Sequence, residues 1–304
     1  MGHHYESMHE LVGHTPMVRL SHVGAPEGVG LFAKLELWNP SGSVKDRTGM
    51  YMVQDAERRG LLHPGSTIVE GTAGNMGLGI AFAALGKGYR VIFVVPEKFS
   101  EEKQTLMRAL GAEIVSTSQE GGMSEAASKA DELASSIPGA VALGQFHNQA
   151  NPQAHYETTG PEIWDDLDGD IDCFVAGAGS GGTFTGIMRL LKERDPSIRG
   201  ILADPVGSTM GGGTHADYAT EGIGNDFVAE TMDMSLVDKV VKVDDEKAYE
   251  GSRLLAREEG IIAGSSSGAA LAAALEVARG MHAGTVVTLF PDRGDRYFSK
   301  HLFA

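Results

Sequence analysis

One lysine follows a turn-forming segment, and its position could make it a nucleophile. Lys45 comes directly after NPSGSV (39–44) and opens a predicted helix over residues 45–59. The positive end of a helix dipole disfavours a charged lysine, and burial would act in the same direction. A neutral amine can form a Schiff base with a carbonyl group. A solvent-facing lysine beside Asp46 explains this segment equally well, so both interpretations stay open at this point.

The segment VEGTAGNMG (69–77) follows a predicted strand and begins a predicted helix. Its backbone N–H groups could hold a carboxylate, and Asn75 could hydrogen-bond a phenolic oxygen or an amide. The alternative is a glycine-rich turn with no ligand. A further segment, IAGSSSGAA (262–270), places three serines before a helix of small residues. One serine could cap that helix and another could face into a site.

The segment VAGAGSGGT (175–183) is the strongest anion-site candidate. Its glycines let the backbone approach a phosphate, and the following helix adds its N-terminal dipole. The same glycines satisfy the G-x-G-x-x-G dinucleotide pattern, and Asp204 ends the next predicted strand where a ribose-binding acid belongs. A nicotinamide-dependent dehydrogenase is therefore an alternative, although it leaves Lys45 and Asn75 without a role.

Short β-branched runs alternate with helical runs along the chain, and this alternation predicts parallel strands joined by crossover helices. The predicted strands cover residues 66–70, 90–96, 113–117, 171–176, 199–204 and 285–289. The predicted helices cover residues 45–59, 75–85, 100–110, 122–135, 151–164, 181–194, 245–259 and 267–279. Ligands bind at the carboxyl ends of such strands, where the glycine-rich loops lie. We therefore expect an α/β fold.

The charge balance excludes several function classes. The chain has 304 residues, 25 basic and 41 acidic, and a formal net charge of −16, so nucleic acid and anionic membranes are not expected partners. A single cysteine, Cys173, excludes an intrachain disulfide and a cysteine zinc site. The N-terminus has no apolar signal region, and no metal site is expected. We expect a cytoplasmic protein. The acidic excess suggests a high-salt habitat, an ordinary acidic protein being the alternative.

The ordered combination of these segments resembles the pyridoxal-phosphate-dependent cysteine synthase and cystathionine β-synthase family, which has the tryptophan-synthase-β-like fold. The resemblance extends through LVGHTPMVRL (11–20), QFHNQANP (145–152), TTGPEIW (158–164) and PDRGDRY (291–297). It implies two three-layer α/β domains with mostly parallel sheets and the cofactor in the cleft between them. We expect residues 41–150 to form the smaller, moving domain with the asparagine loop. Residues 1–40 and 151–304 would form the larger domain with the phosphate cup.

The resemblance also implies a role for each site residue. Lys45 would hold pyridoxal 5′-phosphate as an internal aldimine and act as the general base, Asn75 would bond the ring hydroxyl oxygen, and Ser266 would face the pyridine nitrogen. The residues implied to form the phosphate cup are Gly179, Ser180, Gly181, Gly182 and Thr183. The residues implied to bind the substrate carboxylate or to line the mouth are Thr72, Ala73, Gly74, Met76, Gln145 and Gly222.

The implied reaction is a β-replacement that makes L-cysteine from an activated serine, O-acetylserine or O-phosphoserine, and sulfide through an aminoacrylate. The close alternative is condensation with homocysteine, because DPVGS (204–208) and EGIGNDF (221–227) look more like cystathionine β-synthases. Most relatives have serine and threonine where this chain has Ala73 and Met76, which puts the amino-acid substrate in doubt more than the cofactor. The resemblance also implies a homodimer.

Overall fold

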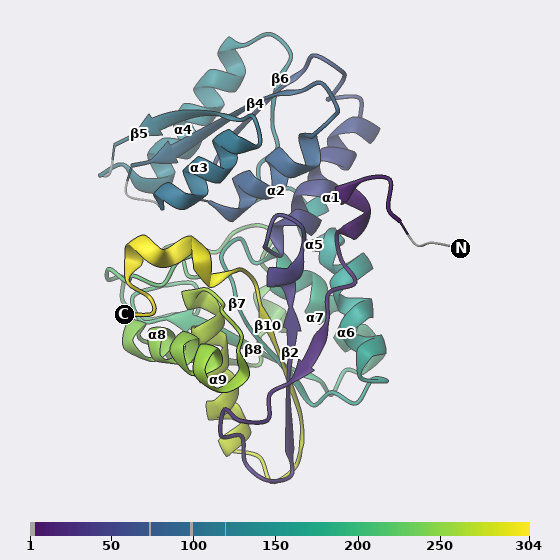
Figure 1. Ribbon diagram of the computed structural model, residues 1–304, viewed down its shortest axis with the longest axis vertical. Coiled ribbons are helices and arrows are strands. Elements are labelled where there is room, and N and C mark those ends of the chain that lie inside the picture. Colours follow the sequence, from purple (N-terminus) through teal and green to yellow (C-terminus); the bar gives the residue numbers. More distant parts are fainter. Residues whose placement is uncertain (1–3, 73, 98–99, 119) are drawn as a thin grey trace.

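The computed structural model describes residues 4–72, 74–97, 100–118 and 120–304. Its strands form two sheets, which lie one above the other in Figure 1. The upper sheet is wholly parallel and has the order β5 (Glu113–Thr117), β4 (Arg90–Pro96), β3 (Thr67–Gly71), β6 (Ala140–Ala142). The lower sheet has the order β1 (Met17–Arg19), β2 (Val29–Leu35), β10 (Gly284–Phe290), β7 (Cys173–Gly177), β8 (Arg199–Pro205), β9 (Lys239–Val243). Among the strands of the described residues, only β1 runs antiparallel to its neighbour.

Helices cover both faces of the upper sheet. Successive side chains of a strand point to opposite faces, and β4 shows the result. Its residues Val91, Phe93 and Val95 pack with α1, α2 and α3, whereas Ile92 and Val94 pack with α4. The bounds of these helices are α1 (Lys45–Arg58), α2 (Asn75–Ala84), α3 (Glu101–Ala109) and α4 (Gly122–Ser136).

The lower sheet is also covered on both faces. In β7, Cys173 and Val175 belong to the core that contains α8 and α9, and Phe174 and Ala176 to the core that contains α6 and α7. The bounds of the helices here are α5 (Ala150–Ala154), α6 (Gly160–Asp166), α7 (Gly182–Arg194), α8 (Asp245–Leu254) and α9 (Ser265–Arg279). Two sheets, each between helical layers, confirm the expected α/β architecture with mostly parallel strands.

Two predicted helices differ from the structure in a similar way. The predicted helix over 151–164 is α5, a π-helical turn η3 (His155–Thr159) and α6. Pro161 lacks an N–H group for the regular i→i−4 ladder, and Thr158 donates its hydroxyl to the carbonyl of Ala154 at 2.5 Å. The predicted helix over 245–259 likewise ends in a π-helical turn, η5 (Leu255–Glu259). The strands β1, β2, β6 and β9 were not predicted from the sequence.

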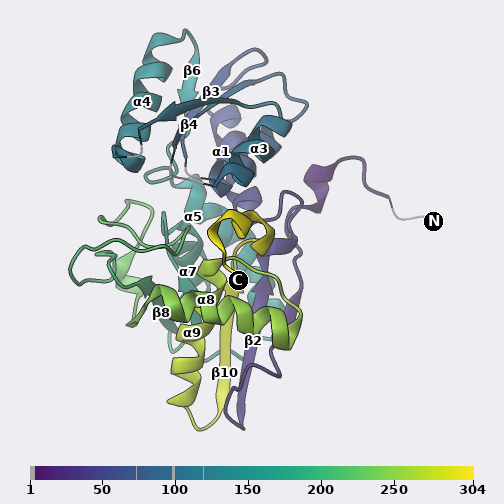
Figure 2. The same cartoon turned by 60° about the vertical axis from the view of Figure 1, so that its left-hand side comes forward.

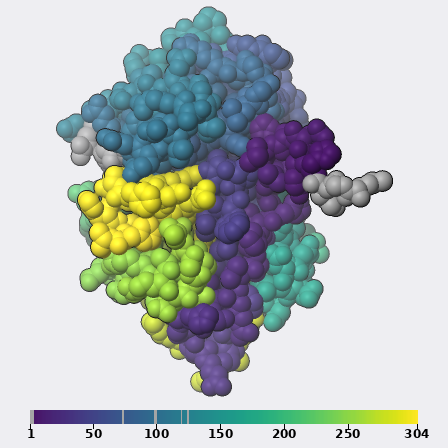
Figure 3. Space-filling view, viewed as in Figure 1, coloured from purple at the N-terminus to yellow at the C-terminus, as the bar shows by residue number. Residues whose placement is uncertain are grey.

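Short helical turns and the C-terminus complete the fold: η1 (Met8–Leu11), η2 (Glu36–Trp38), η4 (Met234–Leu236) and η6 (Gly294–Lys300). Figures 2 and 3 show the C-terminal residues, in yellow, against the part of the chain that carries α3. Ser100, just before α3, donates its hydroxyl to the carbonyl of Arg296 at 3.0 Å. The end of the chain, which follows β10 of the lower sheet, therefore contacts the start of α3 beside the upper sheet. None of the described helices is long and apolar enough to cross a bilayer.

Candidate active site

A cleft of about 500 Å³ lies at the carboxyl ends of β3 and β7. The loops that follow these strands line it, as expected for ligand sites in open α/β sheets. It brings together nearly all the predicted site residues, from both sheets: Lys45, Thr72, Gly74, Asn75, Met76, Gln145, Gly179, Ser180, Gly181, Thr183, Gly222 and Ser266. Gly182 does not line the cleft and packs against Asn151, and the expectation for Ala73 falls outside the described residues.

Lys45 is the first residue of α1 and lines the cleft, where the residue is partly exposed but its amine is surrounded by protein. Burial lowers the pKa of this amine from 10.5 to about 8, because the low-polarity surroundings disfavour the charged form. No described side chain or carbonyl hydrogen-bonds its amine. The structure therefore supports the nucleophile interpretation over a solvent-facing lysine, because about a tenth of the amine is neutral at pH 7, far more than for an exposed lysine.

The loop between β7 and α7 has the features of an anion cradle. Within the described chain, no acceptor takes a hydrogen bond from the backbone N–H groups of residues 179–183. Gly181 has φ +82°, a conformation that favours glycine, and a Cβ on Gly179 would lie 2.6 Å from the carbonyl oxygen of Gly222. Unpaired N–H groups at the start of a 13-residue helix fit a phosphate group.

Side chains hold this loop from behind. Asn151 donates its amide to the hydroxyl of Ser180 at 2.9 Å, and Thr231 donates to the carbonyl of Ser180 at 2.6 Å. His155 hydrogen-bonds the hydroxyls of Thr183 and Thr48 through one ring nitrogen, at 3.2 and 3.0 Å. Burial, with a smaller effect from nearby cations, holds the pKa of His155 well below its ordinary value, so its ring is neutral.

Ser266 is buried at the start of α9 and lines the cleft. Its hydroxyl makes no hydrogen bond within the described part of the chain, so it is free to meet a ligand atom. The expectation that a serine caps this helix is wrong. Gly264 is the N-cap residue, and the neighbouring Ser265 accepts a hydrogen bond from the N–H of Glu221 at 3.2 Å. The hydroxyl of Ser265 thus hydrogen-bonds a residue that is distant in the sequence and does not cap the helix.

The asparagine loop, around Asn75, is held by hydrogen bonds within the loop and by hydrogen bonds to the C-terminal segment. The hydroxyl of Thr72 accepts hydrogen bonds from the N–H groups of Gly74 and Gly77, at 3.3 and 3.2 Å. Both polar atoms of the Asn75 amide are held by residues near the end of the chain, as described below. Met76 lines the cleft but also packs in the core of the upper sheet.

The loop with Gln145 is positioned by a buried acid that the sequence analysis missed. Glu70, in β3, accepts backbone hydrogen bonds from residues 143, 144 and 145 at 2.9–3.2 Å. Burial raises the pKa of Glu70, while these three N–H donors act against that rise. The side chain of Gln145 is left to line the cleft, where it could bind a substrate carboxylate.

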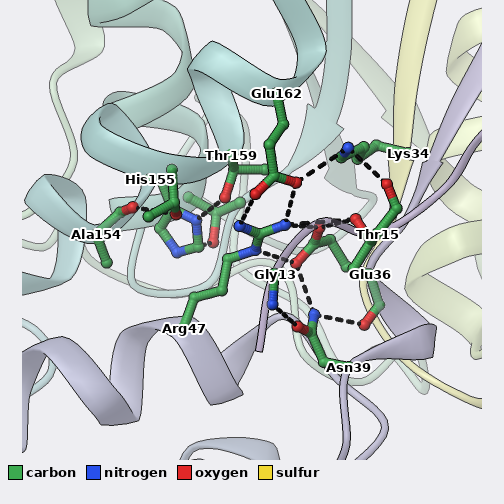
Figure 4. Close-up of polar contacts among 12 residues, drawn as sticks. Gly13, Thr15, Lys34, Glu36, Asn39, Arg47, Ala154, His155, Thr159 and Glu162 are labelled. Atoms are coloured by element: carbon green, nitrogen blue, oxygen red, sulfur yellow. Dashed lines mark hydrogen bonds and ion pairs between the residues drawn. The ribbon is translucent and has the colours of Figure 1, made fainter. Parts of the chain in front are cut away.

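A buried ion network anchors the helix that begins with Lys45 (Figure 4). Arg47 pairs with Glu36 at 2.8 Å and with Glu162 at 2.6 Å, and Lys34 pairs with Glu162 at 3.0 Å. Burial alone would raise the pKa of Glu162, but the hydrogen bonds and charge of Arg47, the charge of Lys34 and the N–H of His14 together outweigh it and hold the pKa at about 2. The network joins α1 to β2 and α6, so the position of Lys45 is fixed relative to the lower sheet.

A second set of charges joins the two sheets at the mouth of the cleft. Lys103, in α3, donates to Glu221 at 2.7 Å and lies 4.3 Å from the centroid of the Tyr297 ring. Lys300 also pairs with Glu221, at 3.6 Å. Glu221 precedes Gly222, whose φ is +87°. No role for these charged side chains could be predicted from the sequence, because they lie far apart in the chain and in no shared motif.

The dinucleotide alternative is not supported. Asp204, which it needs for a ribose, is buried at the end of β8 and is paired with Lys242 at 2.5 Å.

Comparison with known proteins decides the family. The model of the family described as pyridoxal-phosphate dependent enzyme matches residues 8–292. The chain belongs to this family. It is 48 % identical over 295 residues to the O-acetylserine dependent cystathionine beta-synthase of Bacillus subtilis (strain 168), covering 97 % of this chain and 96 % of that protein. It is 44 % identical over 301 residues to the cysteine synthase of Helicobacter pylori (strain J99), covering 98 % and 99 %.

The crystal structure of the O-acetylserine dependent cystathionine beta-synthase from Helicobacter pylori has a TM-score of 0.96 to this pyridoxal-phosphate-dependent enzyme, at 42 % identity and full coverage of both chains. The expected resemblance to the cysteine synthase and cystathionine β-synthase group is therefore confirmed, and so is the expected cofactor. The residues that fit pyridoxal 5′-phosphate in this structure are the unpaired amine of Lys45, the N–H cradle at 179–183 and the free hydroxyl of Ser266.

Proposed function

We propose that this enzyme makes L-cysteine from an activated serine and sulfide. The observation that carries the proposal is the buried, unpaired amine of Lys45, with a pKa of about 8, in one cleft with an anion cradle and Ser266. When bound, the cofactor withdraws electrons from the substrate's α-carbon. A pyridine nitrogen that meets a neutral hydroxyl stays largely unprotonated, which moderates this withdrawal and favours β-elimination over transamination or racemisation.

Each site residue then has a task in the proposed reaction. Lys45 removes the α-proton as general base and later returns it. The hydroxyl of Thr72 and the backbone of the loop at 72–76 bind the substrate carboxylate, together with the amide of Gln145. We propose that residues 41–150 close on the larger domain formed by residues 1–40 and 151–304, which keeps water away from the reacting carbon.

A cofactor assay tests the role of Lys45. The purified enzyme should be yellow, and borohydride should bleach it and attach the cofactor to the peptide that contains Lys45. A colourless protein that takes up nicotinamide dinucleotide would contradict the proposal. Turnover that survives Lys45→Ala would contradict the proposed mechanism.

Condensation with homocysteine is the second candidate, because two of the relatives described above carry the name of O-acetylserine dependent cystathionine beta-synthase. The deciding experiment is a matrix of O-acetylserine, O-phosphoserine and serine against sulfide and homocysteine, at low and high salt. Turnover with homocysteine alone would contradict cysteine synthesis.

We further propose a cytoplasmic homodimer. A groove of about 880 Å³ is lined by apolar side chains of η1, α2 and α3 and offers a surface for a second copy. Its large apolar residues are Met8, Leu78, Phe82, Leu85, Leu106 and Leu110. Sedimentation of the wild-type enzyme and of Leu106→Glu tests this proposal, with dissociation of the variant as the expected result. The salt arms of the activity matrix test the predicted high-salt habitat.

A further inference from the structure

The amide of Asn75 is held from both sides by the C-terminal segment. Arg296 donates from Nη1 to Oδ1 of Asn75 at 2.5 Å, and Nδ2 of Asn75 donates to Oδ2 of Asp292 at 2.6 Å. A guanidinium group can only donate hydrogen bonds, and a carboxylate can only accept them. Both bonds therefore require the same orientation of the amide, with Oδ1 toward Arg296 and Nδ2 toward Asp292. The flipped orientation would lose both bonds.

This orientation leaves one donor of Asn75 for a ligand. A primary amide has two N–H bonds on Nδ2, and Asp292 accepts only one of them. Asn75 lines the cleft. We propose that Arg296 is a positioning residue that, with Asp292, fixes the Asn75 amide so that its second N–H faces the ring oxygen of the cofactor. This inference rests on the proposed role of Asn75 toward pyridoxal 5′-phosphate.

The same guanidinium also holds the turn that leads to Lys45. Nη2 of Arg296 donates to the carbonyl of Ser41, and Asp46 accepts hydrogen bonds from both the N–H and the hydroxyl of Ser41. Gly42 has φ +87°, and a Cβ there would lie 2.7 Å from Nη2 of Arg296, so only glycine fits beside the guanidinium. One rigid planar group thus sets the spacing between the helix that begins with Lys45 and the helix that begins with Asn75.

Burial makes this arrangement stiff. Arg296 is 2 % exposed and Asp292 is fully buried. Asp292 is held in turn by the hydroxyl of Tyr297, at 2.5 Å, and that hydroxyl also accepts from Lys103 at 3.2 Å. Without the guanidinium, Oδ1 of Asn75 would lose its hydrogen-bond donor. Because a buried polar atom without a partner costs free energy, the amide would then reorient.

The test measures cofactor binding rather than turnover. Arg296→Met removes the donors but keeps the length of the side chain. Arg293→Met is the matched control, because Arg293 lies in the same segment, is 55 % exposed and, among the described residues, forms an ion pair only with Asp295, at 3.8 Å. Equilibrium dialysis of the cofactor-free proteins with pyridoxal 5′-phosphate should give about tenfold weaker binding for Arg296→Met, the range for a misplaced hydrogen bond. The control should bind within about twofold of the wild type, and only Arg296→Met should shift the visible absorption maximum of the bound cofactor.

A double-mutant cycle separates positioning from general support of the fold. If Arg296 acts through Asn75, Arg296→Met weakens binding clearly more in the wild-type background than in the Asn75→Ala background, where only its bond to the turn before Lys45 is lost. Equal weakening in both backgrounds, or none in either, overturns the proposal. If Arg296→Met does not fold, Arg296→Lys carries the same cycle, with an expected loss of about threefold or more because one ammonium cannot span both acceptors.

The two proposals fail in different ways. A wild-type enzyme that does not bind pyridoxal 5′-phosphate removes the proposed function and this inference with it. Wild-type binding that Asn75→Ala weakens and Arg296→Met does not overturns the inference alone.

Discussion

Replacing Lys45 with methionine should stabilise the cofactor-free chain at neutral pH. The buried amine has a pKa of about 8 in the folded chain, against 10.5 when exposed. Each pKa unit corresponds to about 1.4 kcal/mol, so the folded chain loses about 3 kcal/mol of stability by keeping this amine protonated below pH 8. Methionine fills a similar volume without a charge. We expect Lys45→Met to raise the free energy of unfolding by up to about that amount at pH 7.

The direction of the pKa shift also determines how the stability of the wild type changes with pH. The folded pKa lies below the unfolded one, so the unfolded chain binds more protons between pH 8 and pH 10.5, and wild-type stability rises with pH across this window. The advantage of Lys45→Met must therefore shrink steadily from pH 8 toward pH 10.5. A stabilising effect of better packing alone would not change with pH.

Guanidinium unfolding of the cofactor-free proteins, at pH values from 7 to 10, measures this difference. Lys129→Met is the matched control, because that lysine is 40 % exposed and should show little effect at any pH. A difference between wild type and Lys45→Met that is constant with pH, or a wild type more stable than the variant at pH 7, would refute the assignment of a buried amine.

Three further outcomes follow from the site. Ser266→Asp should lower the turnover number of β-replacement by at least about tenfold with the cofactor still bound, because a carboxylate favours a protonated pyridine nitrogen; unchanged turnover speaks against the role of the hydroxyl. Arg47→Met leaves the fully buried Glu36 without its cationic partner and should cost about 3–5 kcal/mol in denaturant unfolding; a loss under about 1 kcal/mol would show that the network is not needed. Lys103→Met breaks the ion pair with Glu221 across the cleft. It should raise the KM of the amino-acid donor about three- to tenfold with little change in kcat. A lower kcat with an unchanged KM in steady-state kinetics would contradict a role for this ion pair in closing residues 41–150 on the larger domain.

The local features of the site could be predicted from the sequence because they depend on neighbouring residues. A glycine-rich loop between a strand and a helix produces unpaired N–H groups wherever it folds, and residues 179–183 show them. The start of α1 at Lys45 and of α2 at Asn75 also follow from turn and helix signals nearby. The strand β2 and the acid Glu70 were missed, because their roles depend on partners elsewhere in the chain.

The sequence by itself determined which residue types carry the chemistry and in what order they occur, since these are properties of short segments. Only the tertiary structure decided which partners fix them. Asn75 meets Asp292 and Arg296 across 217 and 221 positions of sequence, and no local periodicity records such a contact. The burial of Lys45 is equally a property of the assembled cleft, because neighbouring elements remove the water that would otherwise hold its charge.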